Sequence, residues 1–220
     1  MKSKLVAALL FSAVAFAAGP PALTADMDAL IADVAKWTSG QPLNPLNELE
    51  QQVRVAVADP KARAQIEGAL IKLLSPETTF EAKRFACQQL AVVGSDAALP
   101  ALAPLLQDNE TAGLVGFALG NRPSAKADQL LRDALANAQD RARLQILATL
   151  GNRRDEKAVD LLSAQAAAAD VPVAQTAIIA LGKIGTPAAR KALAALNEAA
   201  RPALAPALAD ASLRCVERLQ

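Results

Sequence analysis

The chain has 220 residues, among them two cysteines, no tyrosine and no histidine. Without histidine, the sequence excludes Ser-His-Asp triads, Cys-His nucleophiles and histidine-containing zinc or haem sites. Its 23 basic and 22 acidic residues give a formal net charge of +1, which lacks the excess of Lys and Arg that nucleic-acid-binding proteins show.

Residues 1–25 are predicted to be a secretory signal peptide. Two lysines near the start precede residues 5–18, an unbroken run of apolar and small residues. This run is shorter than the roughly 20 apolar residues needed to span a bilayer. Cleavage is expected after Ala25 or, as a second candidate, after Ala17; a buried N-terminal helix is the alternative interpretation. The sequence thus predicts an exported protein, periplasmic or secreted, with no lipid anchor because no cysteine lies near the cleavage site.

Residues 26–75 are predicted to form an irregular N-terminal helical cap. Apolar residues recur at helical spacing in three segments, which cover residues 26–37, 46–58 and 61–74. Asp59 and Pro60 form a start signal for the third, because the carboxylate caps backbone N–H groups and the fixed φ of proline suits the first helical position. The prolines and glycine between residues 38 and 47 predict a loop.

Residues 76–199 contain four copies of one pattern, each about 30 residues long. An apolar run in each copy closes on a leucine: Leu90, Leu119, Leu150 and Leu181. An alanine follows eight residues after each of them and a second leucine twelve residues after: Ala98, Ala127, Ala158, Ala189 and Leu102, Leu131, Leu162, Leu193. A fixed period of about 20 to 50 residues is typical of stacked-repeat proteins, which present an extended surface for binding.

Each copy is predicted to be a pair of helices. The expected first pair covers residues 76–93, with Ser75-Pro76 as its start signal, and 96–107; the other pairs cover 110–137, 140–169 and 170–199. The turns within these three pairs are expected at 120–124, 151–154 and 182–187, with Thr186-Pro187 as a cap. A small residue follows each closing leucine, and we expect it to let the chain leave the helix: Ala91, Gly120, Gly151 and Gly182.

A closing helix is expected within residues 200–220. No segment alternates apolar and polar residues as a half-buried strand would. The sequence therefore predicts a single all-α domain after the signal peptide.

Two segments resemble HEAT repeats of the phycobilisome-lyase-like kind, Ala98-Leu99-Pro100-Ala101-Leu102 and residues 180–189. The resemblance covers about residues 76–199 and implies a right-handed α-α superhelix, an armadillo-like α-solenoid. It implies little about function, because such repeats serve scaffolds, adaptors and a few enzymes. The family name suggests bilin lyase activity, which no residue supports, and the His-Glu pairs of di-iron HEAT hydroxylases have no counterpart in a chain without histidine.

Six basic residues fall at or near the turn between the two helices of successive repeats: Arg122, Lys126, Arg153, Arg154, Lys157 and Lys183. Stacking would place them along one edge, as a ridge that would suit an acidic partner, an anionic polymer or lipid head groups. The alternative is a solvated turn with ion-pair partners such as Asp128, Asp155 and Glu156. Asp155 and Glu156 are interpreted as acids that open a helix rather than as a catalytic pair.

Two further features leave alternatives open. Gly113 and Gly116 lie within a predicted helix, where they indicate either close helix packing or, alternatively, a hinge or partner contact on bare backbone. Cys87 and Cys215 belong to the first repeat and the closing helix, too far apart for a disulfide within the chain, whose Cα atoms must lie within about 7 Å. They are interpreted as buried apolar residues, with an intermolecular disulfide through Cys215 as the alternative.

Taken together, these patterns predict an exported, non-enzymatic protein-protein interaction module or scaffold. No catalytic residue, metal site or cofactor is expected, and the partner is expected to be a protein rather than a nucleic acid. The main alternative is a permanent accessory subunit of an envelope complex. A bilin-lyase-like enzyme is the remaining alternative.

Overall fold

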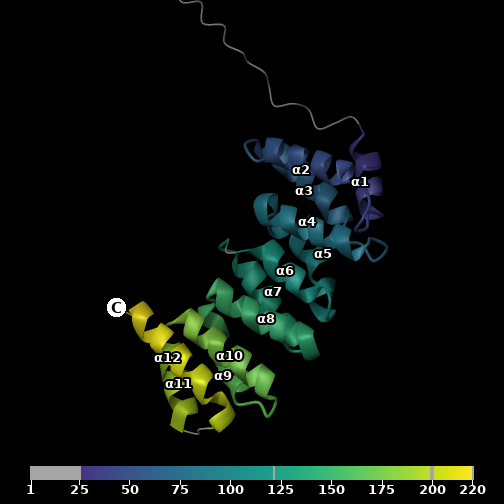
Figure 1. Ribbon diagram of the computed structural model, residues 1–220. Coiled ribbons are helices and arrows are strands. Elements are labelled where there is room, and N and C mark those ends of the chain that lie inside the picture. Colours follow the sequence, from purple (N-terminus) through teal and green to yellow (C-terminus); the bar gives the residue numbers. More distant parts are fainter. Residues whose placement is uncertain (1–25, 121, 199–200, 220) are drawn as a thin grey trace, which may run out of the picture.

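The fold is a stack of helices that follow one another along a curved path, with the first and last helices at opposite ends (Figure 1). The computed structural model describes residues 26–120, 122–198 and 201–219. Within these ranges the regular structure consists of helices, and no strand is present. The predicted all-α solenoid is therefore confirmed, whereas the predicted signal peptide, residues 1–25, lies outside the described residues.

The N-terminal cap consists of α1 (Met27–Ala35), α2 (Asn44–Ala56) and α3 (Pro60–Lys72). Asp59 caps α3 as predicted, since its Oδ1 accepts hydrogen bonds from the backbone N–H groups of Lys61 and Ala62 at 2.7 and 2.9 Å. Helix α2 begins two residues before the predicted position, because Pro45 occupies its first turn instead of ending a loop.

The first helix of repeat one, α4 (Phe80–Val93), begins four residues later than predicted. Thr79, not Ser75, is its N-cap, and the Thr79 Oγ1 accepts a hydrogen bond from Ala82 N at 3.2 Å. The same hydroxyl donates to the carbonyl of Trp37 at 2.6 Å, and Thr79 N donates to the Ala35 carbonyl at 3.0 Å. Contacts with the end of α1 therefore fix the start of α4.

The second helix of repeat one is broken into short pieces, whereas one continuous helix was predicted. The pieces are η1 (Asp96–Ala98), α5 (Leu99–Leu102) and η2 (Pro104–Gln107). Pro104 lacks the N–H that would bond to the carbonyl four residues earlier, and its ring clashes with that carbonyl. The α-helix therefore stops before it.

Repeats two to four follow the predicted helix pairs. Their helices are α6 (Ala112–Leu119) and α7 (Ala125–Leu135), α8 (Asp140–Arg153) with η3 (Glu156–Ala158) and α9 (Val159–Ala166), and α10 (Val171–Ile184) with α11 (Pro187–Glu198). The leucines and alanines of the three repeated columns are all buried, which confirms the register of the repeat. Thr186 Oγ1 accepts from Ala189 N at 3.2 Å, so the predicted cap of α11 is present.

The small residues after the closing leucines do not share one role. Gly120 ends α6 with φ +52°, as expected. Gly151 and Gly182 instead stay inside α8 and α10, so the expectation that they release the chain is wrong. A Cβ on Gly151 would lie 2.6 Å from Ala180 Cα, and a Cβ on Gly182 would lie 2.7 Å from Ala211 Cα. These two glycines let the first helices of adjacent repeats approach closely.

The chain then leaves α8 and α10 at left-handed residues that follow the helices. Arg154 has φ 57° and Gly185 has φ 67°. The two positions lie 31 residues apart, which is one repeat. The same turn is therefore made by glycine in repeat four and by arginine in repeat three.

The C-terminal segment consists of η4 (Pro202–Leu204) and α12 (Ala205–Leu219). Ala211 of α12 contacts Gly182 of α10 just as Ala180 of α10 contacts Gly151 of α8. Helix α12 thus occupies the place of the first helix of a further repeat. No following helix covers it in the described structure, and Leu213 and Val216 are exposed on it.

Cys87 and Cys215 are both buried, in α4 and α12, and neither forms a disulfide. Burial raises the pKa of the Cys87 thiol to about 12. It also raises the pKa of Cys215, against the opposing effect of the nearby Arg190 and Arg218. None of the helices in the described ranges has the length and apolar character needed to cross a bilayer.

Candidate binding surface

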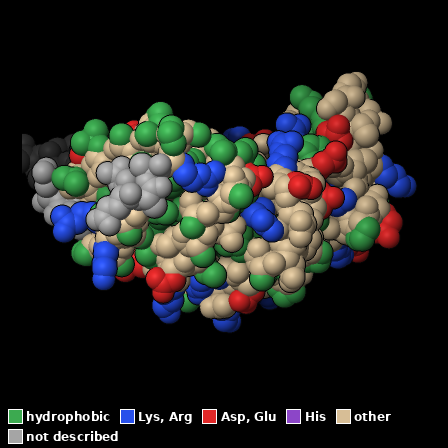
Figure 2. Space-filling view, turned by 90° about the horizontal axis from the view of Figure 1, so that it is seen from below, with side chains coloured by type: hydrophobic (Ala, Val, Ile, Leu, Met, Phe, Trp, Pro, Cys, Tyr) green, Lys and Arg blue, Asp and Glu red, His purple; other side chains and the backbone are tan. Residues whose placement is uncertain are grey.

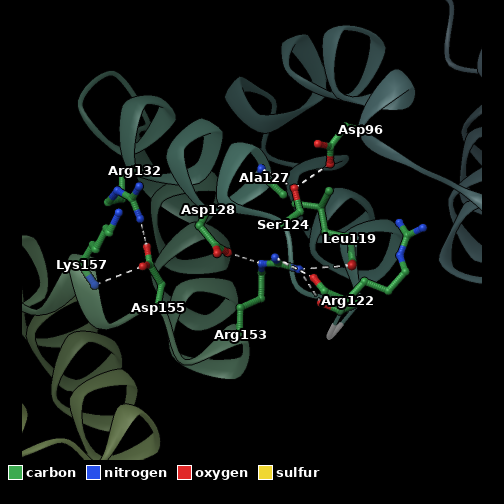
Figure 3. A network of polar contacts seen from close by, with 11 residues as sticks. Asp96, Leu119, Arg122, Ser124, Ala127, Asp128, Arg132, Arg153, Asp155 and Lys157 are labelled. Atoms are coloured by element: carbon green, nitrogen blue, oxygen red, sulfur yellow. Dashed lines mark hydrogen bonds and ion pairs between the residues drawn. The ribbon is translucent and has the colours of Figure 1, made fainter.

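Polar contacts join successive repeats along the edge where the helix pairs turn, and the central part of this series is drawn in Figure 3. At the N-terminal end, the Glu67 carboxylate accepts from Ser95 N at 2.6 Å. One repeat further, Ser124 Oγ donates to Asp96 Oδ1 at 2.6 Å. Many side chains at this edge therefore hold one repeat against the next.

Arg153 is the centre of these contacts. Only 3% of its side chain is exposed, and its Nε forms an ion pair with Asp128 at 2.7 Å. Its remaining N–H groups donate to the carbonyls of Leu119, Gly120 and Arg122 at 3.2, 2.8 and 3.0 Å (Figure 3). Because these carbonyls lie where α6 ends, Arg153 closes that turn from the next repeat. Its donors face the protein and not a partner.

Asp155 and Arg132 form a second internal pair. Their side chains are 5% and 10% exposed, and a carboxylate oxygen of Asp155 accepts directly from Arg132 Nη1. The other carboxylate oxygen accepts from Lys157 N at 3.1 Å, which caps η3. The structural interpretation of Asp155 is therefore supported by its contacts.

The predicted ridge does not come together as one site. Arg122 points away from the Arg153 contacts (Figure 3), and its Nε is buried with no hydrogen-bond partner in the part of the chain that is described. Lys126 is exposed, with its Nζ 3.9 Å from Asp96. Lys157 is exposed on η3. Of the six predicted residues, only Arg154 and Lys183 line a common groove.

That groove, the basic groove, is an open depression of about 370 Å³ between the C-terminal parts of α8, α10 and α12. Four cations and one acid contribute to its lining, together with two glycines and an asparagine: Arg154, Lys183, Arg214, Arg218, Glu217, Gly151, Gly182 and Asn152. Arg214 and Arg218 were not among the site residues predicted from the sequence. Extending the 31-residue period once more from Lys183 leads to Arg214, so the signal was present in the sequence.

The cations of the basic groove differ in their pairing. Arg214 Nε lies 2.8 Å from Asp210 Oδ2, and this contact raises the pKa of Arg214. Lys183 Nζ donates to the neutral Asn152 Oδ1 at 2.7 Å. No ion pair is present for Arg154, Lys183 or Arg218 within the ranges 26–120, 122–198 and 201–219. Three cations of the groove are therefore without an ion pair, and the negative charge of Glu217 in the same lining offsets one of them.

An adjoining depression, the apolar groove, lies over the first helices of repeats one to three and has a volume of about 440 Å³. Its apolar lining comes from Ala91, Ala148 and the ring of Phe117, which is 59% exposed. Three glycines and four polar residues complete the lining: Gly113, Gly116, Gly120, Gln145, Thr149, Asn152 and Arg153. Asn152 lines both grooves, so the two depressions adjoin at this residue.

Gly113 and Gly116 form part of the apolar groove and face α8. A Cβ on Gly116 would lie 2.4 Å from Thr149 Oγ1, and a Cβ on Gly113 would lie 3.2 Å from Gln145 Oε1. These distances favour close helix packing, the first of the two interpretations that the sequence allowed for these glycines.

The charge on the surface is mixed over larger distances. On the face that Figure 2 shows, Lys and Arg side chains lie among Asp and Glu side chains, with hydrophobic side chains between them. Among the described residues, no three His, Cys, Asp or Glu side chains are grouped as metal ligands would be. The basic groove is thus a local feature, set by the few side chains that line it.

The repeat geometry and the comparison with known proteins agree on the class of this protein. The family model for HEAT repeats matches residues 128–213, which run from α7 into α12. The chain therefore contains HEAT repeats, and its described helices form a HEAT-like α-solenoid. The phycobilisome-lyase-like subtype stays a prediction.

Solved structures with a similar arrangement include that of human deoxyhypusine hydroxylase in complex with glycerol. Its sequence is 16% identical, the match covers 87% of this chain and 96% of that chain, and the TM-score is 0.43. An engineered protein is similar at 19% identity, with 88% of this chain and 98% of that chain covered and a TM-score of 0.40. No curated protein matches the chain.

Proposed function

We propose that this protein is an exported, non-enzymatic module that binds a protein partner through the surface formed by its first helices. The observation that supports this most is the adjacency of the basic and apolar grooves, which meet at Asn152. Together they extend from α4 to α12. A stacked-repeat chain offers such a surface because each repeat contributes one helix to it.

The composition of the two grooves suits binding better than catalysis. Phe117 offers an exposed aromatic ring beside small residues, and aromatic side chains often anchor protein interfaces. Glu217 is the one carboxylate among the lining residues of both grooves, so neither groove pairs two acids for general acid–base work.

A site-specific crosslinking experiment tests the proposed surface. Benzoylphenylalanine in place of Phe117 is expected to capture one partner in stoichiometric amount from native envelope or culture-medium extract. The matched control is the same residue in place of Leu43, which is 53% exposed and lies just before α2. Equal capture at both positions, or no capture by folded protein, would contradict the proposal.

Export rests on the pattern of residues 1–25 and has its own test. Intact-mass measurement of protein recovered from its native host is expected to find a chain that begins after Ala25 or Ala17. A chain that retains residues 1–25 would contradict export and leave the binding proposal unaffected.

A permanent accessory subunit is the second candidate, favoured by Leu213 and Val216, which are exposed on α12. Such a subunit is expected to co-purify with its complex at high salt and to aggregate alone. A monomer that stays soluble on light-scattering analysis would exclude it.

A further inference from the structure

We infer that the basic groove binds an acidic peptide segment, with the side chains of Arg154, Lys183 and Arg218 receiving its carboxylates. The inference rests on the proposed function, which it deepens by naming the chemistry of the partner. The apolar groove would then take an apolar side chain of the same partner, since both grooves are joined at Asn152.

The basic groove is built by close helix packing. Gly151 and Gly182 bring α8, α10 and α12 together, and Figure 1 shows these three helices side by side. Arg218 lies over Gly185, where an added Cβ would come within 2.5 Å of the Arg218 Cδ. The glycines thus place cations from three consecutive repeat positions around one depression.

The backbone at Arg154 points to a role beyond folding. Arg154 is left-handed, a conformation that costs a non-glycine residue about 1–2 kcal/mol. The equivalent residue one repeat later is Gly185, which adopts it without this cost. The guanidinium of Arg154 is exposed at the groove. No ion pair in the described ranges explains why an arginine occupies this strained position.

The spacing of the cations suits a peptide better than a single small anion. The cations come from α8, α10 and α12, and the Arg218 side chain reaches back over Gly185 at the end of α10. The groove therefore spans roughly one helix spacing, about 8–10 Å, which an extended peptide covers with about three residues at about 3.3 Å per residue. Arginine binds carboxylates through two parallel hydrogen bonds, which favours Glu or Asp side chains at these positions.

Fluorescence anisotropy with the mature chain tests this inference. The probe is a fluorescein-labelled octapeptide of alternating glutamate and alanine. We expect saturable binding that weakens at least tenfold between 50 and 500 mM NaCl. The reason is that the screening length between charges falls to about 4 Å at the higher salt concentration. Arg154→Gly and Arg218→Ala are each expected to weaken binding at least fivefold.

The matched control is Lys157→Ala, which removes one exposed positive charge outside the groove. It should change the affinity less than twofold, and an equal loss in all three variants would overturn the inference in favour of general charge attraction. Arg154→Gly should also melt no lower than the wild type, which separates lost binding from lost folding.

Other outcomes are equally decisive. Binding to vesicles of phosphatidylglycerol and phosphatidylcholine without binding to the peptide would overturn the inference, as would full displacement of the peptide by 1 mM inorganic phosphate. If the octapeptide fails while crosslinking through position 117 succeeds, the acidic-peptide inference is wrong and the proposed function stands. If both fail with folded protein, both are wrong.

Discussion

Glycine has opposite roles at different positions of this chain. Gly182 lies inside α10 against Ala211, whereas Gly68 lies inside α3 with no atom within 4 Å of an added Cβ. Both residues carry the entropic cost of glycine in a helix, about 0.5–1 kcal/mol relative to alanine. Only at Gly182 is that cost offset by a close contact.

We therefore expect Gly182→Ala and Gly68→Ala to change stability in opposite directions. Gly182→Ala should lower the free energy of unfolding by about 1–3 kcal/mol because the new methyl group overpacks the contact with α12. Gly68→Ala should raise it by about 0.5–1 kcal/mol. Urea unfolding followed by circular dichroism measures both, and a stabilising Gly182→Ala would contradict the close approach of α10 and α12.

Arg154 is a second residue whose backbone conformation affects stability. Arg154→Gly should raise the free energy of unfolding by about 0.5–1 kcal/mol, because glycine adopts the left-handed conformation without steric cost. Arg154→Ala removes the same charge and keeps the strain, so its midpoint in urea should stay near that of the wild type. Equal stability of Arg154→Gly and Arg154→Ala would contradict the view that backbone strain at residue 154 lowers the stability of the wild type.

Within helix α9, two neighbouring leucines differ in their burial. Leu162 belongs to the repeated column and is fully buried, whereas Leu161 is 42% exposed. Leu162→Ala should cost about 2–5 kcal/mol of unfolding free energy, because it removes buried methyl groups and leaves a cavity. Leu161→Ala should cost less than about 1 kcal/mol. Thermal unfolding that ranks these variants the other way would contradict the register of the repeat.

The residue at which a helix begins depends on both local and distant contacts. Asp59 caps α3 and Asp170 caps α10 through their own carboxylates, which a sequence pattern can identify. Ser75-Pro76 looks like an equally good start, yet α4 begins after Thr79, whose hydroxyl donates to the carbonyl of Trp37. Trp37 is distant in the sequence, so no local pattern could favour the later start.

At the scale of the whole molecule, each repeat contacts mainly its neighbours, so the stack is expected to open from its ends. The reactivity of the two cysteine thiols can show which part of the stack opens. Both are buried, one in the terminal α12 and one in α4. With its pKa raised to about 12, the Cys87 thiol is ionised in only about one molecule in ten thousand at pH 8 while the fold is intact.

We therefore expect a thiol reagent at pH 8 to modify Cys215 at least ten times faster than Cys87. The single-cysteine variants Cys87→Ala and Cys215→Ala, treated with dithionitrobenzoate, give the two rates separately. The rates should become equal in denaturing urea, where both thiols have ordinary pKa values. A slower reaction at Cys215 in the native protein would contradict opening from the C-terminal end.

The predicted ridge illustrates what a repeat pattern leaves open. The period placed Arg153, Arg154 and Lys183 at the same edge, and they do lie near the turns between helices. The direction of each side chain depends on its neighbours across the stack. Arg153 turns inward to the carbonyls at the end of α6, whereas Arg154, the next residue, is exposed at the basic groove.

The sequence alone was sufficient to predict the helical class and the leucine and alanine columns of the core. These features depend on short-range periodicity, which repeats often enough to be recognised. The tertiary structure alone decided that Gly151 and Gly182 are contacts between helices, that α12 continues the stack, and that Arg154, Lys183 and Arg218 surround one groove. The reason is physical: close approach and side-chain direction depend on residues about 30 or more positions away, which meet only when the repeats stack.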